Sequence, residues 1–160
     1  MHEDALHDGL VGAFSVAENL GLDRHDKAPF AARGSLNLAE IERNAKHRVE
    51  EFDVRPPVTL APANTLSGGN QQKVVLAKWL SMKPRCMIVD EPTRGIDVGA
   101  KNEIYQLMRA LADSGVAVLM ISSDMEEVIG VSDRIAVMHE GSISGFLDRG
   151  EFSEHNVLQL

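Results

Sequence analysis

Cysteine is almost absent from this sequence, because Cys86 is the single one among 160 residues. One thiol can form neither an internal disulfide nor a cysteine metal cluster, so a reducing compartment, by default the cytoplasm, is expected. Aromatic residues make up only 4% of the chain, and no apolar run approaches the roughly 20 residues that a membrane-spanning helix needs. We therefore expect any link to a membrane to go through a partner.

Positive charge is also in short supply, since 16 Lys and Arg stand against 24 Asp and Glu, giving a formal net charge of −8. A protein that binds nucleic acid through phosphate contacts is normally basic, so direct nucleic-acid binding is not expected. Hydrophobic residues make up 44% and charged residues 25%, which is ordinary for a folded, water-soluble domain. The length fits one domain with a sizeable core.

The first third of the chain is polar and interrupted by glycine and proline, which is typical of loops around short helices. An amphipathic helix is predicted over residues 36–52, with Ser35 as its N-cap, because apolar side chains recur there at helical spacing. The prolines at positions 56, 57 and 62 then predict a stiff, extended connector. We place a boundary there and divide the chain into residues 1–62 and residues 63–160.

From Leu66 onward, helices alternate with apolar runs of strand length, the order that builds a parallel sheet covered by helices. The predicted helices span 69–82, 99–114 and 125–129, and the predicted buried strands span 85–90 and 116–122. A strand pair is predicted at 134–139 and 142–147, turning at Glu140-Gly141, and a final helix within 151–160. The expected fold class is therefore α/β.

A serine followed by two glycines opens the first of these helices, in the run Leu66-Ser67-Gly68-Gly69-Asn70-Gln71-Gln72-Lys73. Ser67 can accept hydrogen bonds from the free backbone amides of the first helical turn, and the glycines allow an anion to approach the positive end of the helix. An ordinary serine cap with two flexible glycines is the alternative. On its own, the motif leaves both interpretations open.

Two acidic residues end the apolar run that begins at Cys86, where a buried strand should meet solvent. Ligands bind at that edge of open α/β sheets, so Asp90 is the candidate ligand for Mg²⁺, directly or through water. Glu91 would point the other way and could orient or deprotonate a water molecule near a phosphate. The alternative is that both carboxylates only cap the turn before Pro92.

Three motifs together resemble the ATP-binding cassette (ABC) ATPases. Leu66 to Gln72 is similar to the signature motif, Met87 to Glu91 to the Walker B strand, and Thr93 to Asp97 to the D-loop. The form of the motifs resembles the second cassette of the duplicated ATPase subunits that energise bacterial ribose, galactose, xylose and autoinducer-type importers. Residues 3–10 and 15–20 resemble the same subfamily's Q-loop segment and the start of its helical subdomain. The resemblance implies a parallel-sheet ABC ATPase core with a helical subdomain, which couples ATP hydrolysis to sugar uptake.

Two features depart from the family pattern. The phosphate-binding run G-x-x-x-x-G-K-[ST], the Walker A motif, does not occur between Met1 and Leu160, so the printed chain carries only part of an ATP site. Ser123 stands where the family's switch histidine is expected; a serine can hydrogen-bond a γ-phosphate but lacks the charge and reach of an imidazole. The resemblance implies that this substitution is common in the second cassette of sugar importers.

The resemblance also implies ATP and Mg²⁺ as cofactors and a second cassette, paired head to tail, as a partner. The signature loop would contact a γ-phosphate held by the partner cassette, while Glu91 and Ser123 would be the catalytic residues for ATP held by this cassette, with Asp90 on the metal. Asp97 would lie between the two sites, and it can also cap the helix that begins near Val98. The residues implied in nucleotide binding are Glu3, Ser67, Gly68, Gly69, Asn70, Gln71 and Asp97.

The further partners implied are permease subunits in the membrane and, through them, a periplasmic binding protein. Such partners would place the chain on the cytoplasmic face of the inner membrane. The alternative function is an ABC protein that does not transport, or a degenerate one that lends its signature loop to a partner cassette without turnover of its own. A non-transport ABC protein should carry basic patches and a switch histidine, whereas this chain is acidic and has Ser123.

Overall fold

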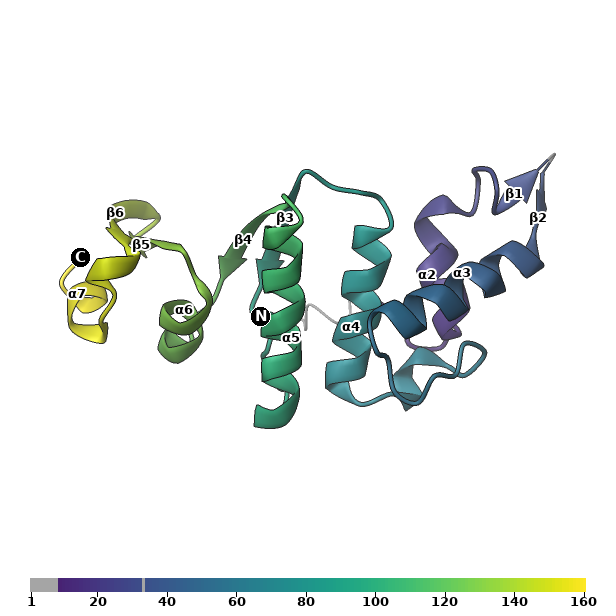
Figure 1. Ribbon diagram of the computed structural model, residues 1–160, viewed down its shortest axis with the longest axis horizontal. Coiled ribbons are helices and arrows are strands. Elements are labelled where there is room, and N and C mark those ends of the chain that lie inside the picture. Colours follow the sequence, from purple (N-terminus) through teal and green to yellow (C-terminus); the bar gives the residue numbers. More distant parts are fainter. Residues whose placement is uncertain (1–8, 33) are drawn as a thin grey trace.

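The computed structural model describes residues 9–32 and 34–160. Figure 1 shows these residues as an elongated arrangement with α2 and α3 toward one end and the strands β5 and β6 toward the other. In chain order the elements are α2 (Val16–Gly21), η1 (Leu22–Arg24), β1 (Ala31–Ala32), β2 (Ser35–Leu36), α3 (Leu38–Glu51), η2 (Ala63–Thr65), α4 (Gly68–Leu80), β3 (Cys86–Asp90), α5 (Val98–Asp113), β4 (Ala117–Ile121), α6 (Met125–Val131), β5 (Arg134–His139), β6 (Ser142–Asp148), η3 (Arg149–Glu151) and α7 (Glu154–Leu158). Within the described residues, no helix is both long and apolar enough to cross a bilayer.

The amphipathic helix predicted in the first third is present as α3, but its cap differs from the prediction. Asn37 is the N-cap, and its Oδ1 accepts a hydrogen bond from the Glu40 backbone amide at 3.3 Å. Ser35 lies in the short strand β2, two residues earlier, so the predicted serine cap was wrong. The reason is that β2 pairs with β1 and keeps the backbone extended past the serine.

The proline-rich connector runs back along the start of α2. The backbone amides of Val16 and Ala17 donate to the carbonyl oxygens of Ala61 and Thr59, at 3.1 and 2.8 Å. Apolar residues on both sides of this connector share one buried cluster, which includes Val16, Ala45, Val49, Val74, Ile104 and Met108. The division at residue 62 stays a prediction.

The α/β fold class is confirmed in the middle of the chain. Strands β3 and β4 pair in parallel, with Cys86 opposite Ala117 and Asp90 opposite Ile121. The helices α4 and α5 lie side by side in Figure 1 and contact one another. A parallel pair needs a crossover connection, and α5 provides it. The two helices and the strand pair are the frame that positions the candidate site.

Only one face of β3 is buried, although the sequence predicted a buried strand. Met87 and Val89 are each 7% exposed, whereas Ile88 between them is 67% exposed. Leu119 and Ile121 of β4 are exposed as well. Side chains alternate between the two faces of a strand, so one set packs on the helices and the other forms an apolar surface. Because every residue from Cys86 to Val89 is apolar, the sequence does not show which side chains are exposed.

The C-terminal part matches its predicted elements closely. Strands β5 and β6 form an antiparallel hairpin whose turn residues Glu140 and Gly141 have φ angles of 49° and 78°. Two successive positive φ angles match the right-handed twist of a hairpin, which is why a glycine stands at the second position. Helix α6 is longer than predicted and α7 is shorter.

The two faces of β3 give the first prediction. Val89→Ala should lower the free energy of unfolding by about 1–3 kcal/mol, because it removes buried methyl groups. Ile88→Ala should change it by less than about 0.5 kcal/mol, since the side chain is already in water. Urea unfolding of both variants beside the wild type tests this. A larger loss for Ile88→Ala would show that its face is covered in the folded protein.

Candidate functional site

The structure brings Glu91 and Ser123 together at the carboxyl end of the parallel strands. Glu91 follows β3 directly, and its backbone amide donates to the carbonyl oxygen of Ile121 at 2.8 Å. Its φ of 45° turns the chain out of the strand. The backbone amide of Ser123 then donates to the Glu91 carboxylate, with 3.0 Å between N and Oε1. A carboxylate is thereby held in one orientation at the sheet edge.

Asp90 is the last residue of β3, opposite Ile121, and its side chain is exposed. Within residues 9–32 and 34–160, no group of three or more His, Cys, Asp or Glu side chains could enclose a metal ion. Mg²⁺ is commonly held by one or two carboxylates, with water and phosphate oxygens completing its coordination. A single accessible carboxylate at the sheet edge fits that mode of binding.

The start of α4 differs from the predicted serine cap. Ser67 has the extended backbone of an N-cap, but its side chain accepts no hydrogen bond from an amide of the first turn. Its Oγ accepts instead from the Asn70 side chain at 2.9 Å, while the Asn70 Oδ1 accepts from the Arg55 backbone amide at 2.6 Å. The Ser67 hydroxyl is thus hydrogen-bonded to Asn70 and not to the backbone amides of the first turn. The Ser67 hydroxyl leaves the first-turn amides of α4 uncapped, as an anion site requires.

The two glycines of the motif have different surroundings. A Cβ on Gly69 would lie 2.7 Å from the Cβ of Ala100, so only glycine permits α4 to approach α5 this closely. A Cβ on Gly68 would meet nothing nearer than the Gly95 carbonyl oxygen, at 3.9 Å. The helix start therefore lies beside the segment that follows Glu91. Close packing on α5 explains why residue 69 is a glycine, whereas the space around Gly68 is open.

The remaining predicted site residues have contacts within the chain. Gln71 donates from its side-chain amide to the Leu66 carbonyl oxygen at 2.8 Å, which holds the loop before α4. Asp97 is the N-cap of α5, and its Oδ1 accepts from the Ala100 amide at 3.0 Å. The helix-cap interpretation of Asp97 is confirmed, and a role between two sites stays a prediction. Glu3 lies outside the described residues.

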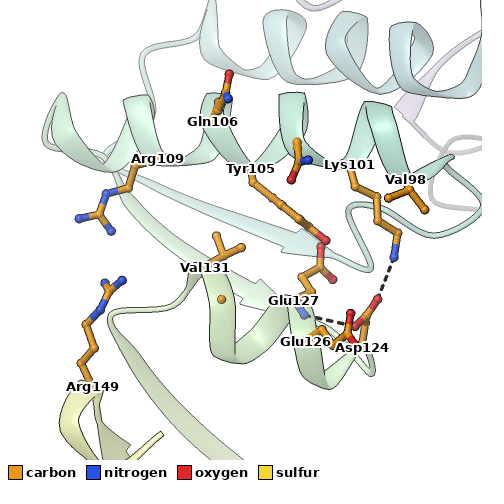
Figure 2. A pocket seen from close by; sticks show the side chains of 12 residues that line it. Val98, Lys101, Tyr105, Gln106, Arg109, Asp124, Glu126, Glu127, Val131 and Arg149 are labelled. Carbon is orange, nitrogen blue, oxygen red and sulfur yellow. Dashed lines mark hydrogen bonds and ion pairs between the residues drawn. The ribbon is translucent and has the colours of Figure 1, made fainter. Parts of the chain in front are cut away.

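A cleft of about 630 Å³ lies between α5 and α6, and none of the residues that line it was singled out from the sequence. Figure 2 shows Lys101 reaching the Asp124 carboxylate, with 2.8 Å between Nζ and Oδ2. This hydrogen bond lowers the pKa of Asp124 and raises that of Lys101. Burial raises the pKa of Tyr105, and hydrogen bonding to Thr93 opposes that shift.

One signal in the sequence could have found part of this cleft. Asp124 stands three residues before Glu127, the spacing typical of a helix N-cap. In the structure its Oδ1 accepts from the Glu127 backbone amide at 3.2 Å and starts α6. The partner Lys101 is 23 residues away along the chain, so local spacing could not indicate the ion pair.

Comparison with known proteins identifies the family of this chain. The family model for the ABC transporter matches residues 5–94. The chain is 49% identical over 158 residues to the ribose import ATP-binding protein RbsA of Lactococcus lactis subsp. cremoris, and 48% identical over 164 residues to the arabinose import ATP-binding protein AraG of Ralstonia nicotianae. Each alignment covers 99% of this chain. This chain belongs to the ABC transporter family.

A solved structure supports the same assignment. The chain resembles the dimeric structure of MJ0796, a bacterial ABC transporter cassette, with a TM-score of 0.69 and 25% identity. That match covers 88% of this chain and 59% of the cassette. The chain spans 32% of the length of RbsA and of AraG. The family and fold predicted from the motifs are confirmed.

The close approach of α4 and α5 gives the second prediction. Gly69→Ala should lower the free energy of unfolding by about 1–3 kcal/mol, because its methyl group would overlap Ala100. Gly68→Ala is the matched control and should change it by less than about 1 kcal/mol, since nothing obstructs its methyl group. Thermal unfolding of both variants tests this, and adding Ala100→Gly should restore part of the loss. Equal effects of the two single variants would contradict the packing argument.

The ion pair between Lys101 and Asp124 gives the third prediction. The pKa of Asp124 is lowered in the folded chain, so the carboxylate stabilises the fold above its ordinary pKa of 3.8. This contribution is lost as the pH falls through the lower pKa of the folded state. Asp124→Asn should therefore lower the unfolding midpoint at pH about 7, and the difference from the wild type should shrink toward pH about 3. Asp26→Asn controls for surface charge, and a difference independent of pH would contradict the assignment.

Proposed function

We propose that this chain is the ATP-hydrolysing part of the nucleotide-binding subunit of a bacterial ABC importer for sugars or sugar-like molecules. The observation that carries the proposal is its 49% identity to a ribose import ATP-binding protein, across 99% of the chain. The likeness to an arabinose import ATP-binding protein, at 48% identity, points to the same substrate class. The subunit would couple ATP hydrolysis to uptake.

Glu91 is the proposed catalytic carboxylate. The Ser123 backbone amide engages its Oε1, so Oε2 can orient the attacking water or accept its proton. Within the described residues, the Ser123 hydroxyl makes no hydrogen bond and can donate to a γ-phosphate oxygen. Holding a carboxylate in one orientation lowers the reorganisation that the reaction needs. The arrangement therefore suits hydrolysis of a phosphate bond.

Asp90 is the proposed Mg²⁺ ligand. Its carboxylate is accessible at the carboxyl end of β3, one residue before Glu91. When bound, Mg²⁺ neutralises charge on the phosphate oxygens during transfer. In this proposal Asp90 binds the metal ion, and Glu91, the next residue, orients or deprotonates the attacking water.

The start of α4 is the proposed contact with a nucleotide held by a second cassette. Ser67, Gly68 and Gly69 would meet its γ-phosphate, because the helix start is positive and the Ser67 side chain leaves its amides uncapped. The dimeric structure of MJ0796 supports a pair of cassettes. Asn70 and Gln71 would keep the loop in shape for that contact.

The proposed assignments of Asp97 and Glu3 rest mainly on the resemblance. Asp97 caps α5 through Oδ1, and its exposed position would let it couple the two nucleotide sites across the cassette interface. Glu3 would contribute to nucleotide binding from the Q-loop-like segment. The further proposed partners are membrane permease subunits and, indirectly, a periplasmic binding protein. Such partners would put the subunit on the cytoplasmic face of the membrane. The word "import" in the names of both relatives supports these partners.

The fourth prediction concerns Glu91. In the natural protein that carries this sequence, Glu91→Gln should lower kcat for ATP hydrolysis by about 10²–10⁴-fold, because the amide cannot accept a proton from water. The dissociation constant for Mg-ATP should stay within about threefold, since the substitution keeps the shape of the side chain. Phosphate release and nucleotide binding by calorimetry measure the two quantities.

Glu50→Gln is the matched control, because Glu50 is an exposed glutamate on α3. It should leave both quantities at their wild-type values. Wild-type turnover in Glu91→Gln would overturn the role of Glu91 alone. No ATP hydrolysis by the wild-type protein with its permease and second cassette would overturn the proposed function and favour the alternative without turnover.

A further inference from the structure

Glu127 is the one buried Asp or Glu side chain among the residues that the structure describes, with 2% of its surface exposed. Both carboxylate oxygens accept hydrogen bonds from hydroxyl groups. Thr93 donates from Oγ1 to Oε1 at 3.0 Å, and Ser122 donates from Oγ to Oε2 at 2.5 Å. In Figure 2 the Glu127 side chain lies between α5 and α6 and points toward the hydroxyl end of the Tyr105 side chain.

The two hydroxyl groups belong to the segments that carry the candidate catalytic pair. Thr93 comes two residues after Glu91, and Ser122 comes directly before Ser123. The Ser122 Oγ also accepts from the Asp124 backbone amide at 3.0 Å, which closes the loop after β4. One carboxylate thus joins the chain after β3 to the chain after β4.

Burying a carboxylate costs free energy unless its oxygens are hydrogen-bonded and its charge is balanced. Here the two hydroxyls satisfy the oxygens. Lys101 on α5 supplies positive charge: its pKa is raised mainly by its hydrogen bond to Asp124, and the charge of Glu127 adds to the shift. Removing Glu127 would take away the carboxylate oxygen to which Thr93, which is 3% exposed, donates. The hydrogen bonds to Glu127 therefore stabilise the two segments in this arrangement.

We propose that Glu127 is a positioning residue for Glu91: by holding Thr93 and Ser122 together, it fixes the Ser123 amide against the Glu91 carboxylate. Its side chain acts through the two segments and contacts no reacting atom. The consequence for turnover rests on the proposed function, because it requires Glu91 to be the catalytic carboxylate. The structural part of the proposal does not, because it concerns a hydrogen bond within the chain.

The fifth prediction separates these two parts. In Glu127→Gln the amide group can accept from only one of the two hydroxyls, so the Ser123 amide should lose part of its bond to Glu91. With selective isotope labelling of serine, the Ser123 amide resonance should move toward its position in Glu91→Ala, which lacks the acceptor. The experiment uses the nucleotide-free natural protein. A Ser123 resonance unchanged from the wild type in Glu127→Gln would overturn the proposal.

Kinetics then measure the effect on the reaction. Glu127→Gln should lower kcat by about 10–100-fold and change KM for ATP by less than about threefold, because misplacing a catalytic group mainly affects the transition state. Glu126→Gln is the matched control, an exposed glutamate one residue away on α6, and should behave as the wild type. Wild-type kcat in Glu127→Gln would overturn the positioning role in catalysis.

A second pair of variants keeps the test valid if Glu127→Gln folds poorly. Thr93→Val removes the hydroxyl and retains the volume, so it should lower kcat and shift the Ser123 resonance in the same direction. Thr93→Ser keeps the hydroxyl and should restore both toward the wild type. A Thr93→Val variant that keeps wild-type kcat and the Ser123 resonance would overturn the proposal. An inactive wild-type protein would defeat the proposed function, while the resonance would still decide whether Glu127 positions Glu91.

Discussion

The parallel pairing of β3 with β4 is the constraint on which the candidate site depends. With Asp90 opposite Ile121, the next backbone amide, that of Glu91, still donates to Ile121. Only then does the chain turn out of the strand, which brings the Glu91 carboxylate to the Ser123 amide. A register slip of one residue would move the side chains of the slipped strand to opposite faces of the sheet and separate this pair. Backbone pairing therefore determines the geometry of the two catalytic candidates.

Much of the second half of the chain could be predicted from the sequence, because local rules govern it. Apolar runs and helical periodicity located β3, β4, α4 and α5 to within about two residues, which is ordinary for such boundaries. The turn at Glu140-Gly141 followed from its residue types. The motifs also singled out Glu91 and Ser123 before any geometry was known. Their contact required the strand register, which only the folded chain provides.

The differences from the sequence predictions came from contacts outside the pattern that each prediction used. Ser67 has the residue type and backbone of a helix cap, but a neighbouring asparagine, held by the Arg55 amide, takes its hydroxyl. Ile88 belongs to an apolar run that predicts burial, but its side chain is 67% exposed because it lies on the open face of β3. Glu127 was not singled out from the sequence, and it hydrogen-bonds to Thr93, 34 residues earlier. The contacts of Asn70 with Arg55 and of Glu127 with Thr93 join residues 15 and 34 positions apart, which spacing along the chain does not indicate.

The absence of a side chain at Gly69 has a mechanical consequence. Since a Cβ there would lie 2.7 Å from the Cβ of Ala100, the two helices interlock where both of them begin. Closely packed surfaces resist sliding, so a shift of one helix along the other is opposed at this point. Helix α5 begins directly after the segment that leaves β3. A displacement of the start of α4 would therefore act on the start of α5 and, through it, on the segment that leaves β3.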